Sequence, residues 1–236
     1  MIATFRIATF NLENLDDRPN LEPPLARRVQ LLRPQLDRLA GDILCLQEVN
    51  GQPRSTRRRR RLAALDSLLA GTAYADFARA TTEGPHGPFD VQNLVTLSRW
   101  PIKDRRQLRN DLVPPPVYAP VTQVPPGQPA LLTWDRPLLY VAVDLGGGVA
   151  LHIVNLHLRA PLASFIAGQK LDQFAWRSIG GWAEGFYLAA LKRSGQALEA
   201  RLLIDSLFDT DPDALIAVCG DLNADAHEMP LRILHG

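Results

Sequence analysis

The chain has 236 residues, of which 46% are hydrophobic and 22% are charged, and its formal net charge is +1. These values are those of a globular protein, and they exclude a disordered, collagen-like or coiled-coil chain. A charge near zero creates no overall field that would draw the protein to nucleic acid or to an anionic membrane. The length alone allows one domain or two, although large α/β sandwiches and barrels of this size often form a single unit.

The two cysteines, Cys45 and Cys219, lie inside apolar runs, which predicts buried reduced thiols and excludes a disulfide scaffold. The first residues lack the basic and long apolar segments of a signal peptide. No run approaches the roughly 18 apolar residues that a membrane helix needs. We therefore expect a cytoplasmic protein with no membrane insertion and no obligate protein partner.

The first part of the chain alternates predicted strands and helices. Apolar and polar residues alternate over residues 3–10, which predicts a strand. Helical spacing predicts a helix over residues 25–40, in which Pro34 should cause a kink. A short apolar run predicts a strand over residues 42–49, and a second helix is predicted over residues 58–70. This order is typical of an α/β layer.

Five consecutive arginines, Arg57–Arg61, lie at the start of the second predicted helix. Such a run can form a nucleic-acid patch, but a single short run is more often the solvated entry of a helix. We favour the structural interpretation.

The rest of the chain contains further strands and two long irregular excursions. Short apolar runs predict strands over residues 74–80, 91–98, 138–144, 149–156 and 214–219. Seven prolines in residues 111–129 exclude a regular helix or central strand and predict a surface excursion. A second excursion is predicted over residues 161–185, and helical spacing predicts a helix over residues 186–208.

Polar side chains from a narrow chemical set follow four of the predicted strands. They are found in FNLEN (residues 10–14), LQEV (46–49), VNLHL (154–158) and GDLNA (220–224). Strand ends at one sheet edge come together in space, and carboxylate and amide oxygens suit Mg²⁺, Mn²⁺ or Ca²⁺. A histidine beside such a cation can exchange a proton, so the set predicts hydrolysis of a phosphoester.

In the motifs TFNLENL, DILCLQEV, NLVTLSRWPI, VNLHL and GDLNA, the chain resembles the endonuclease/exonuclease/phosphatase superfamily over residues 7–224. The resemblance implies a four-layered α/β sandwich, with two mostly antiparallel sheets face to face and helices outside. It also implies a single domain over residues 1–236. The implied activity is hydrolysis of a phosphoester with Mg²⁺ or Mn²⁺ as cofactor.

The resemblance also implies which residues hold the metal. Glu48 matches the principal metal-binding glutamate of the superfamily. Asn11 matches the amide that lies near the metal and the substrate phosphate. Glu13 lies where some members have an additional acidic ligand.

Further residues match the catalytic positions of the superfamily. His157 matches the histidine that some branches carry, and Asp221 matches the aspartate implicated in proton transfer. Asn223 matches the asparagine that holds the scissile phosphate. Asn155 precedes the histidine and is expected either to support the loop or to contribute to phosphate binding.

The chain departs from the superfamily pattern after GDLNA. Members normally continue to a terminal Ser-Asp-His element, which this sequence does not contain. We therefore expect a shortened member whose metal site assembles but whose catalysis is impaired.

The resemblance leaves the substrate open. A phosphodiester is favoured, with nucleic acid as a candidate, which would make the protein a nuclease or phosphodiesterase. A lipid or sugar phosphate is the first alternative, since nucleases often present a basic groove and this chain is nearly neutral. The second alternative is a non-catalytic remnant that binds a phosphate ligand or a partner protein.

Overall fold

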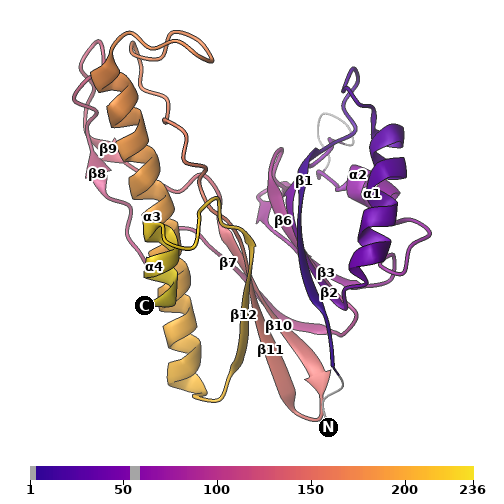
Figure 1. Cartoon of the computed structure of the whole chain (residues 1–236). Helices are drawn as coiled ribbons and strands as arrows, with labels where there is room; N and C mark the ends of the chain where they lie inside the picture. Colours follow the sequence, from indigo (N-terminus) through magenta and orange to yellow (C-terminus); the bar gives the residue numbers. More distant parts are fainter. Residues whose placement is uncertain (1–3, 54–58) are drawn as a thin grey trace. The chain divides into compact units, whose positions relative to one another are not determined.

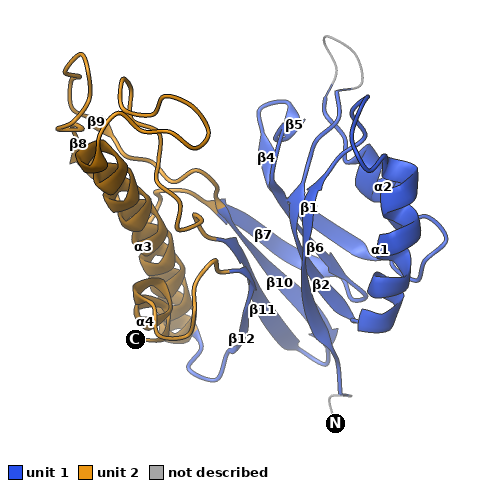
Figure 2. Ribbon diagram, turned by 45° about the horizontal axis from the view of Figure 1, so that its top comes forward, with its two compact units in different colours: residues 1–107, 138–157, 211–221 blue, residues 108–137, 158–210, 222–236 orange. Residues whose placement is uncertain are grey.

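In a computed structural model, residues 4–53 and 59–236 of the chain are described (Figure 1). The chain divides into two compact units, each assembled from three separate stretches (Figure 2). The first unit comprises residues 1–107, 138–157 and 211–221, and the second comprises residues 108–137, 158–210 and 222–236. The single domain expected over residues 1–236 stays a prediction.

The first unit contains a four-stranded sheet whose outer face is covered by two helices (Figure 2). The bounds of these elements are β1 Ile7–Leu15, α1 Leu25–Leu39, β2 Ile43–Val49, α2 Ala63–Leu69, β3 Ala78–Thr81 and β6 Asn93–Ser98. The strand order is β1-β2-β6-β3. Strands β1 and β2 are parallel, whereas β2 and β3 are each antiparallel to β6.

A second four-stranded sheet completes the first unit. Its strands are β7 Ile102–Leu108, β10 Leu138–Gly146, β11 Val149–His157 and β12 Leu215–Asp221, in the order β12-β11-β10-β7. The strands predicted over residues 138–144 and 149–156 are β10 and β11, which pair antiparallel as a hairpin around Gly146, Gly147 and Gly148. Strand β12 runs parallel to β11 at the end of the sheet, and none of its residues is fully buried. A short hairpin, β4 Glu83–Gly84 with β5 Gly87–Pro88, projects from the unit.

The two sheets pack face to face around a shared apolar core. Ile43 and Cys45 of β2 and Leu94 of β6 meet Val141 of β10 and Ile153 of β11. Burial of such side chains contributes about 25 cal/mol for each Å² of apolar surface removed from water. Strand β2 also carries leucines into the core beneath α1 and α2, so its run is apolar on both faces. The expected α/β class with two facing sheets is confirmed.

The second unit is organised by one long helix. Helix α3, Ile179–Thr210, has 32 residues, and α4, Met229–His235, packs beside it (Figure 2). In the proline-rich excursion, β8 (Val117–Tyr118) pairs with β9 (Ala130–Leu131).

A fully buried glutamate of α3 holds both ends of the proline-rich excursion. The Glu199 carboxylate accepts hydrogen bonds from the backbone N–H groups of residues 110–112 over 2.7–3.1 Å. It also accepts one from Trp134 Nε1 at 2.8 Å. A buried carboxylate is stable only when such donors replace water, so this excursion has one preferred path over the helix.

A second buried glutamate, Glu184, holds the middle of the same excursion. It accepts hydrogen bonds from the Tyr118 hydroxyl at 2.8 Å, from the Val121 N–H at 2.6 Å, and from the N–H and hydroxyl of Thr122. Burial alone would raise the pKa of Glu184, but these donors outweigh burial and lower it. Burial, together with the bond to Glu184, raises the pKa of Tyr118 to about 12.

The stability that Glu184 contributes is expected to disappear in acid. Its folded-state pKa lies below its ordinary value, so the contribution is complete above the unfolded-state pKa and is lost as the pH falls through the folded-state pKa. Limited proteolysis within residues 115–125 should therefore accelerate below about pH 4 in the wild-type chain. A Glu184→Gln variant should be cleaved rapidly at neutral pH already. Equal cleavage of both proteins at pH 7 would contradict this role of Glu184.

The structure corrects several predicted boundaries. The helix expected over residues 58–70 is α2, which begins at Ala63, and the strand expected over residues 74–80 is β3, which begins at Ala78. Arg57 and Arg58, and residue 3 of the first predicted strand, lie outside the described residues. Strand β7 and helix α4 were not predicted. Strand β7 is charged at most positions, as suits a strand at a sheet edge.

Helix α3 begins at Ile179, well before the predicted start at residue 186, because its glycines do not break it. A Cβ on Gly185 would lie 2.7 Å from the Ser164 carbonyl oxygen, and a Cβ on Gly181 would lie 2.5 Å from Gln169 Oε1. Glycine at these positions allows the second excursion to pack directly against the helix.

Candidate active site

Four polar side chains from four strands of the first unit meet in one place. Asn11 comes from β1, Glu48 from β2, His157 from β11 and Asp221 from β12. Glu48 Oε1 and Asp221 Oδ2 lie 3.6 Å and 3.8 Å from His157 Nε2. We call these four residues the carboxylate cluster. They are four of the seven residues named from the sequence.

The amide of Asn11 lies at the centre of the carboxylate cluster. Its Nδ2 donates to Glu48 Oε1 at 3.1 Å and to Asp221 Oδ2 at 2.8 Å. Its Oδ1 accepts the backbone N–H of Glu13 at 2.8 Å, which directs the NH₂ group toward the two carboxylates. Since β1 and β12 are the end strands of different sheets, the Asn11–Asp221 bond also joins the sheet edges.

Glu48 lies at a corner of the backbone. Its φ is +59°, a left-handed conformation that non-glycine residues seldom adopt. The register of β2 shifts near Glu48 against both neighbouring strands. Against β1 the shift lies between Asn11 and Leu15, and against β6 it lies between Leu46 and Val49. The corner directs the carboxylate toward the bulge of β1, where the Asn14 N–H donates to Glu48 Oε2 at 3.0 Å. Strained backbone of this kind is frequent at functional sites.

His157 is almost completely buried, with 3% of its surface exposed. The Asp221 side chain is 30% exposed and the Glu48 side chain 15% exposed. The separations from His157 Nε2 to the carboxylates exceed hydrogen-bond length but allow electrostatic attraction when the imidazole is protonated. His157 therefore lies behind the carboxylates, and Asp221 faces the solvent.

The other residues named from the sequence occupy different environments. The Glu13 side chain is exposed, and the residue contacts the cluster through its backbone N–H. Asn223 belongs to the second unit, where its Nδ2 donates to the Leu158 carbonyl at 3.1 Å. Its own carbonyl accepts a hydrogen bond from Arg193.

Asn155 has a structural position between the two sheets. It is fully buried, and its Oδ1 accepts Gln47 Nε2 at 2.8 Å. Its Nδ2 donates to the backbone carbonyls of Leu46 and Val95 at 3.4 Å and 3.1 Å. The amide has no exposed surface. Both of its expected roles, support of the loop and phosphate binding, stay predictions, and its burial favours the first.

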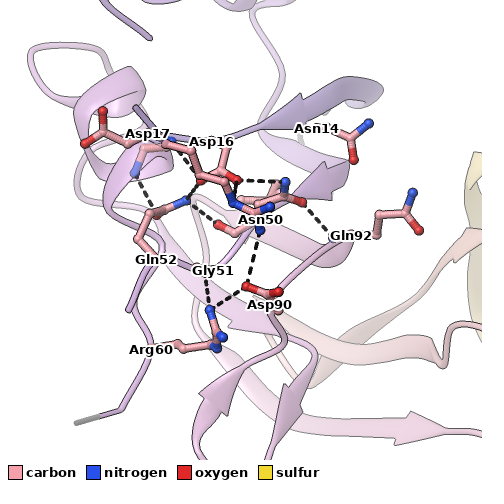
Figure 3. A network of polar contacts seen from close by, with 12 residues as sticks. Asn14, Asp16, Asp17, Asn50, Gly51, Gln52, Arg60, Asp90 and Gln92 are labelled. Carbon is pink, nitrogen blue, oxygen red and sulfur yellow. Dashed lines mark hydrogen bonds and ion pairs between the residues drawn. The ribbon is translucent and has the colours of Figure 1, made fainter. Parts of the chain in front are cut away.

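A polar network that was not predicted holds the loops that follow β1 and β2 (Figure 3). At its centre is the buried Asp16 carboxylate, which accepts Asn50 Nδ2 at 3.1 Å, Gln52 Nε2 at 2.8 Å and Arg18 Nε at 2.7 Å. Asn50 Oδ1 in turn accepts the backbone N–H of Gln92 at 2.9 Å. Asp16 directly follows β1 and Asn50 directly follows β2, and this placement is the only sequence signal for the network.

The same network extends to a basic residue from the arginine run. Arg60 Nη1 donates to Asp90 Oδ1 at 2.6 Å and to the Gly51 carbonyl at 2.9 Å (Figure 3). Arg18 also pairs with Asp90, at 3.3 Å. Arg60 therefore binds protein groups. It lies before α2, which begins at Ala63, so this part of the run is not the solvated entry of a helix.

A hard divalent cation fits the chemistry of the carboxylate cluster. The carboxylates of Glu48 and Asp221 both accept hydrogen bonds from the neutral amide of Asn11. A bound cation would reduce the repulsion between these two negative groups. Over residues 4–53 and 59–236, no three His, Cys, Asp or Glu side chains are grouped as a ready-made metal centre. Mg²⁺ keeps several of its waters and requires only one or two carboxylates. The amide oxygen of Asn11, however, is engaged by the Glu13 N–H.

The family model described as Endonuclease/Exonuclease/phosphatase family matches residues 8–235. The chain belongs to this family. The resemblance noted in the sequence motifs is thus confirmed, and enzymes of the family depend on divalent metals. No curated protein matches the chain by sequence.

Solved structures share the fold of this family member. TDP2 from Caenorhabditis elegans has a TM-score of 0.55 and 15% identity, over 94% of this chain and 48% of that one. The mannosyl-6-phosphatase of Bacteroides thetaiotaomicron has a TM-score of 0.58 and 12% identity, over 98% and 70%. The human nocturnin catalytic domain, solved with a bound sulfate anion, has a TM-score of 0.53 and 16% identity, over 97% and 67%.

The chain spans about half of the length of the C. elegans TDP2 chain that it matches, so the activity of that whole protein is not carried over to it.

Across the part of the chain that the structure describes, no helix is both long and apolar enough to span a membrane.

Proposed function

We propose that this protein is a metal-dependent phosphoester hydrolase. The observation that supports the proposal most directly is the pair of carboxylates, Glu48 and Asp221, bridged by the Asn11 amide beside His157. A site of this composition can hold a cation and move a proton, which are the two requirements of phosphoester hydrolysis. Membership of the family supports the same reaction.

In the proposed reaction, Asp221 takes the proton of the attacking water. Its carboxylate is the more exposed of the two, so water can reach it. Asn11 holds this carboxylate in place through Nδ2. His157, when protonated, stabilises the negative charge of Glu48 and Asp221 from the buried side, and it supports the geometry rather than contacting water. Asn223 is proposed to hold the scissile phosphate, as the family motif implies.

The proposed cofactor is Mg²⁺ or Mn²⁺, with Glu48 as its principal protein ligand. Asp221 would share the charge of the ion, and Asn11 and Glu13 remain proposed contributors. When bound, the cation neutralises the charge that develops on the phosphate oxygens. The ordering of Glu48 by the Asn11 amide and the Asn14 N–H would keep its carboxylate ready for this task.

A phosphodiester is the proposed substrate class, with nucleic acid as the first candidate to test. A lipid or sugar phosphate is the alternative, and the name of the B. thetaiotaomicron mannosyl-6-phosphatase favours including a sugar phosphate. The net charge of +1 gives no additional reason to choose nucleic acid.

The proposal is tested by assaying the purified chain on bis(p-nitrophenyl) phosphate and on p-nitrophenyl phosphate. Hydrolysis is expected with Mg²⁺ or Mn²⁺ and should stop when EDTA removes the ion. Faster cleavage of the diester would support the phosphodiesterase assignment, and faster cleavage of the monoester would support the alternative. The Glu48→Gln variant, purified in the same way, reports any contaminating hydrolase. Rates equal to that control would refute hydrolysis by this chain.

A further inference from the structure

The bulge of β1 is held from its outer side by one arginine of α1. Arg28 Nη1 donates to the Asn14 carbonyl at 3.2 Å, and Arg28 Nη2 donates to the Leu12 carbonyl. These two carbonyls flank Glu13, so a single guanidinium spans the bulge. Arg28 is half-buried and lies in the first turn of α1, whose beginning is set by the bonds of Arg27 and Arg28 N–H to the Pro24 carbonyl.

The inner side of the same bulge supplies two N–H groups to the carboxylate cluster. The Glu13 N–H donates to Asn11 Oδ1 and the Asn14 N–H donates to Glu48 Oε2. Both bulge residues have left-handed backbones, with φ of +49° for Glu13 and +54° for Asn14. This conformation is unfavourable for residues other than glycine and persists only where surrounding contacts maintain it.

We propose that Arg28 is a positioning residue for the active site. By binding the two carbonyls, it keeps the bulge in the conformation that directs the Glu13 and Asn14 N–H groups at Asn11 and Glu48. The catalytic part of this inference rests on the proposed hydrolase function, whereas the geometric part does not.

The geometry requires an arginine in particular. A guanidinium presents several N–H donors in a rigid planar fork, which can reach two acceptors at once. A lysine at position 28 would keep the charge and the helix propensity, but its three donors share one nitrogen and lack the planar fork that spans two separate carbonyls. Arg28→Lys is therefore the decisive variant, and Arg28→Ala removes both contacts. Arg27→Ala is the matched control, because Arg27 lies on the same turn, is exposed, and binds Gln30 on its own helix.

The first measurement is amide hydrogen exchange of the full chain, followed residue by residue. In Arg28→Ala, exchange of the Asn14 and Glu13 amides is expected to become about 10–100-fold faster, since hydrogen bonds to a charged group are lost. Amides of β2 and β6 should keep their wild-type rates, which separates a local effect from general destabilisation. Arg28→Lys should give an intermediate increase, and Arg27→Ala should give none.

The second measurement is hydrolysis of bis(p-nitrophenyl) phosphate with Mn²⁺, well below the melting temperature. Displacement of Glu48 and Asn11 is expected to lower kcat about 10–100-fold in Arg28→Ala, with little change in KM. Wild-type exchange at Asn14 in both Arg28 variants would overturn the proposal. Wild-type kcat in both variants would overturn its catalytic part. If Arg28→Ala does not fold, Arg28→Lys decides.

The two proposals fail in different ways. If the wild-type chain hydrolyses no phosphoester, the proposed function is wrong, and the exchange of the Asn14 amide still decides whether Arg28 holds the bulge. If the wild-type chain is active and the Arg28 variants match it in both measurements, the hydrolase assignment stands and the positioning role is wrong.

Discussion

Replacement of Glu48 by glutamine is expected to remove both metal binding and hydrolysis. The wild-type chain should gain about 5–11 °C in melting temperature at a Mn²⁺ concentration of roughly 100 times its Kd, because ligand binding stabilises the folded state. The Glu48→Gln variant should gain nothing. Hydrolysis should fall about 10²–10³-fold, as when a preorganised electrostatic contact to the reacting group is lost. Thermal melts with and without Mn²⁺ measure the first effect, and steady-state kinetics measure the second.

Two further variants make this result interpretable. Glu22→Gln changes an exposed carboxylate in the loop before α1 and should keep the Mn²⁺ response of the wild type. Glu13→Gln tests whether the exposed carboxylate on the bulge is an additional ligand, since only then should the Mn²⁺ response shrink. Superimposed Mn²⁺ titrations of the wild type and Glu48→Gln would show that Glu48 does not bind the ion. Glu48 accepts hydrogen bonds from Asn11 and Asn14 with its two oxygens, whereas glutamine has one oxygen. We therefore expect Glu48→Gln to have a slightly lower melting temperature than the wild type in the absence of metal.

Replacement of Asp221 by asparagine is expected to leave the fold intact and to lower kcat about 10²–10⁴-fold, the usual effect of losing a general base. The asparagine oxygen can still accept Asn11 Nδ2, so the link between β1 and β12 should survive. The melting temperature without metal should therefore remain close to that of the wild type. Steady-state kinetics on the same phosphodiester, together with thermal melts, test both statements.

The matched control for this variant is Asp213→Asn, an exposed aspartate just before β12. It carries the same chemical change on the same segment, away from the cluster, and should keep wild-type kcat. A wild-type kcat in Asp221→Asn would exclude the aspartate as the proton acceptor.

The sequence pointed to the carboxylate cluster because its residues lie at or near the ends of apolar runs, in motifs that resemble those of the superfamily. Glu48, His157 and Asp221 lie at or beside strand ends and Asn11 lies at the bulge of β1, and strand pairing brings these positions together whatever the length of chain between them. The alternation of predicted strands and helices indicated the α/β class, whereas the two facing sheets were implied by the resemblance to the superfamily. The motifs therefore carried most of the information about the site.

The supporting contacts could not be predicted, because they join side chains to distant backbone groups. Glu199 meets residues 110–112 through backbone N–H groups, which every residue except proline has, and Arg28 meets Leu12 and Asn14 through backbone carbonyls, which every residue has. Asn155 illustrates a different difficulty. Its place in VNLHL suggested either support or phosphate binding, and the sequence does not reveal that the side chain is completely buried between the sheets, which favours support.

The position of β1 and β12 at the ends of their sheets has a consequence for how the site responds to heat. End strands open locally at a lower free energy than interior strands, because fewer backbone hydrogen bonds must break. Asn11 and Asp221 therefore sit on the parts of the site that fray first, whereas Glu48 and His157 sit on interior strands. On warming, the bond that joins the sheet edges is expected to open while the core remains packed. If Asp221 accepts the proton as proposed, hydrolysis should then fail at a temperature where the chain as a whole is still folded.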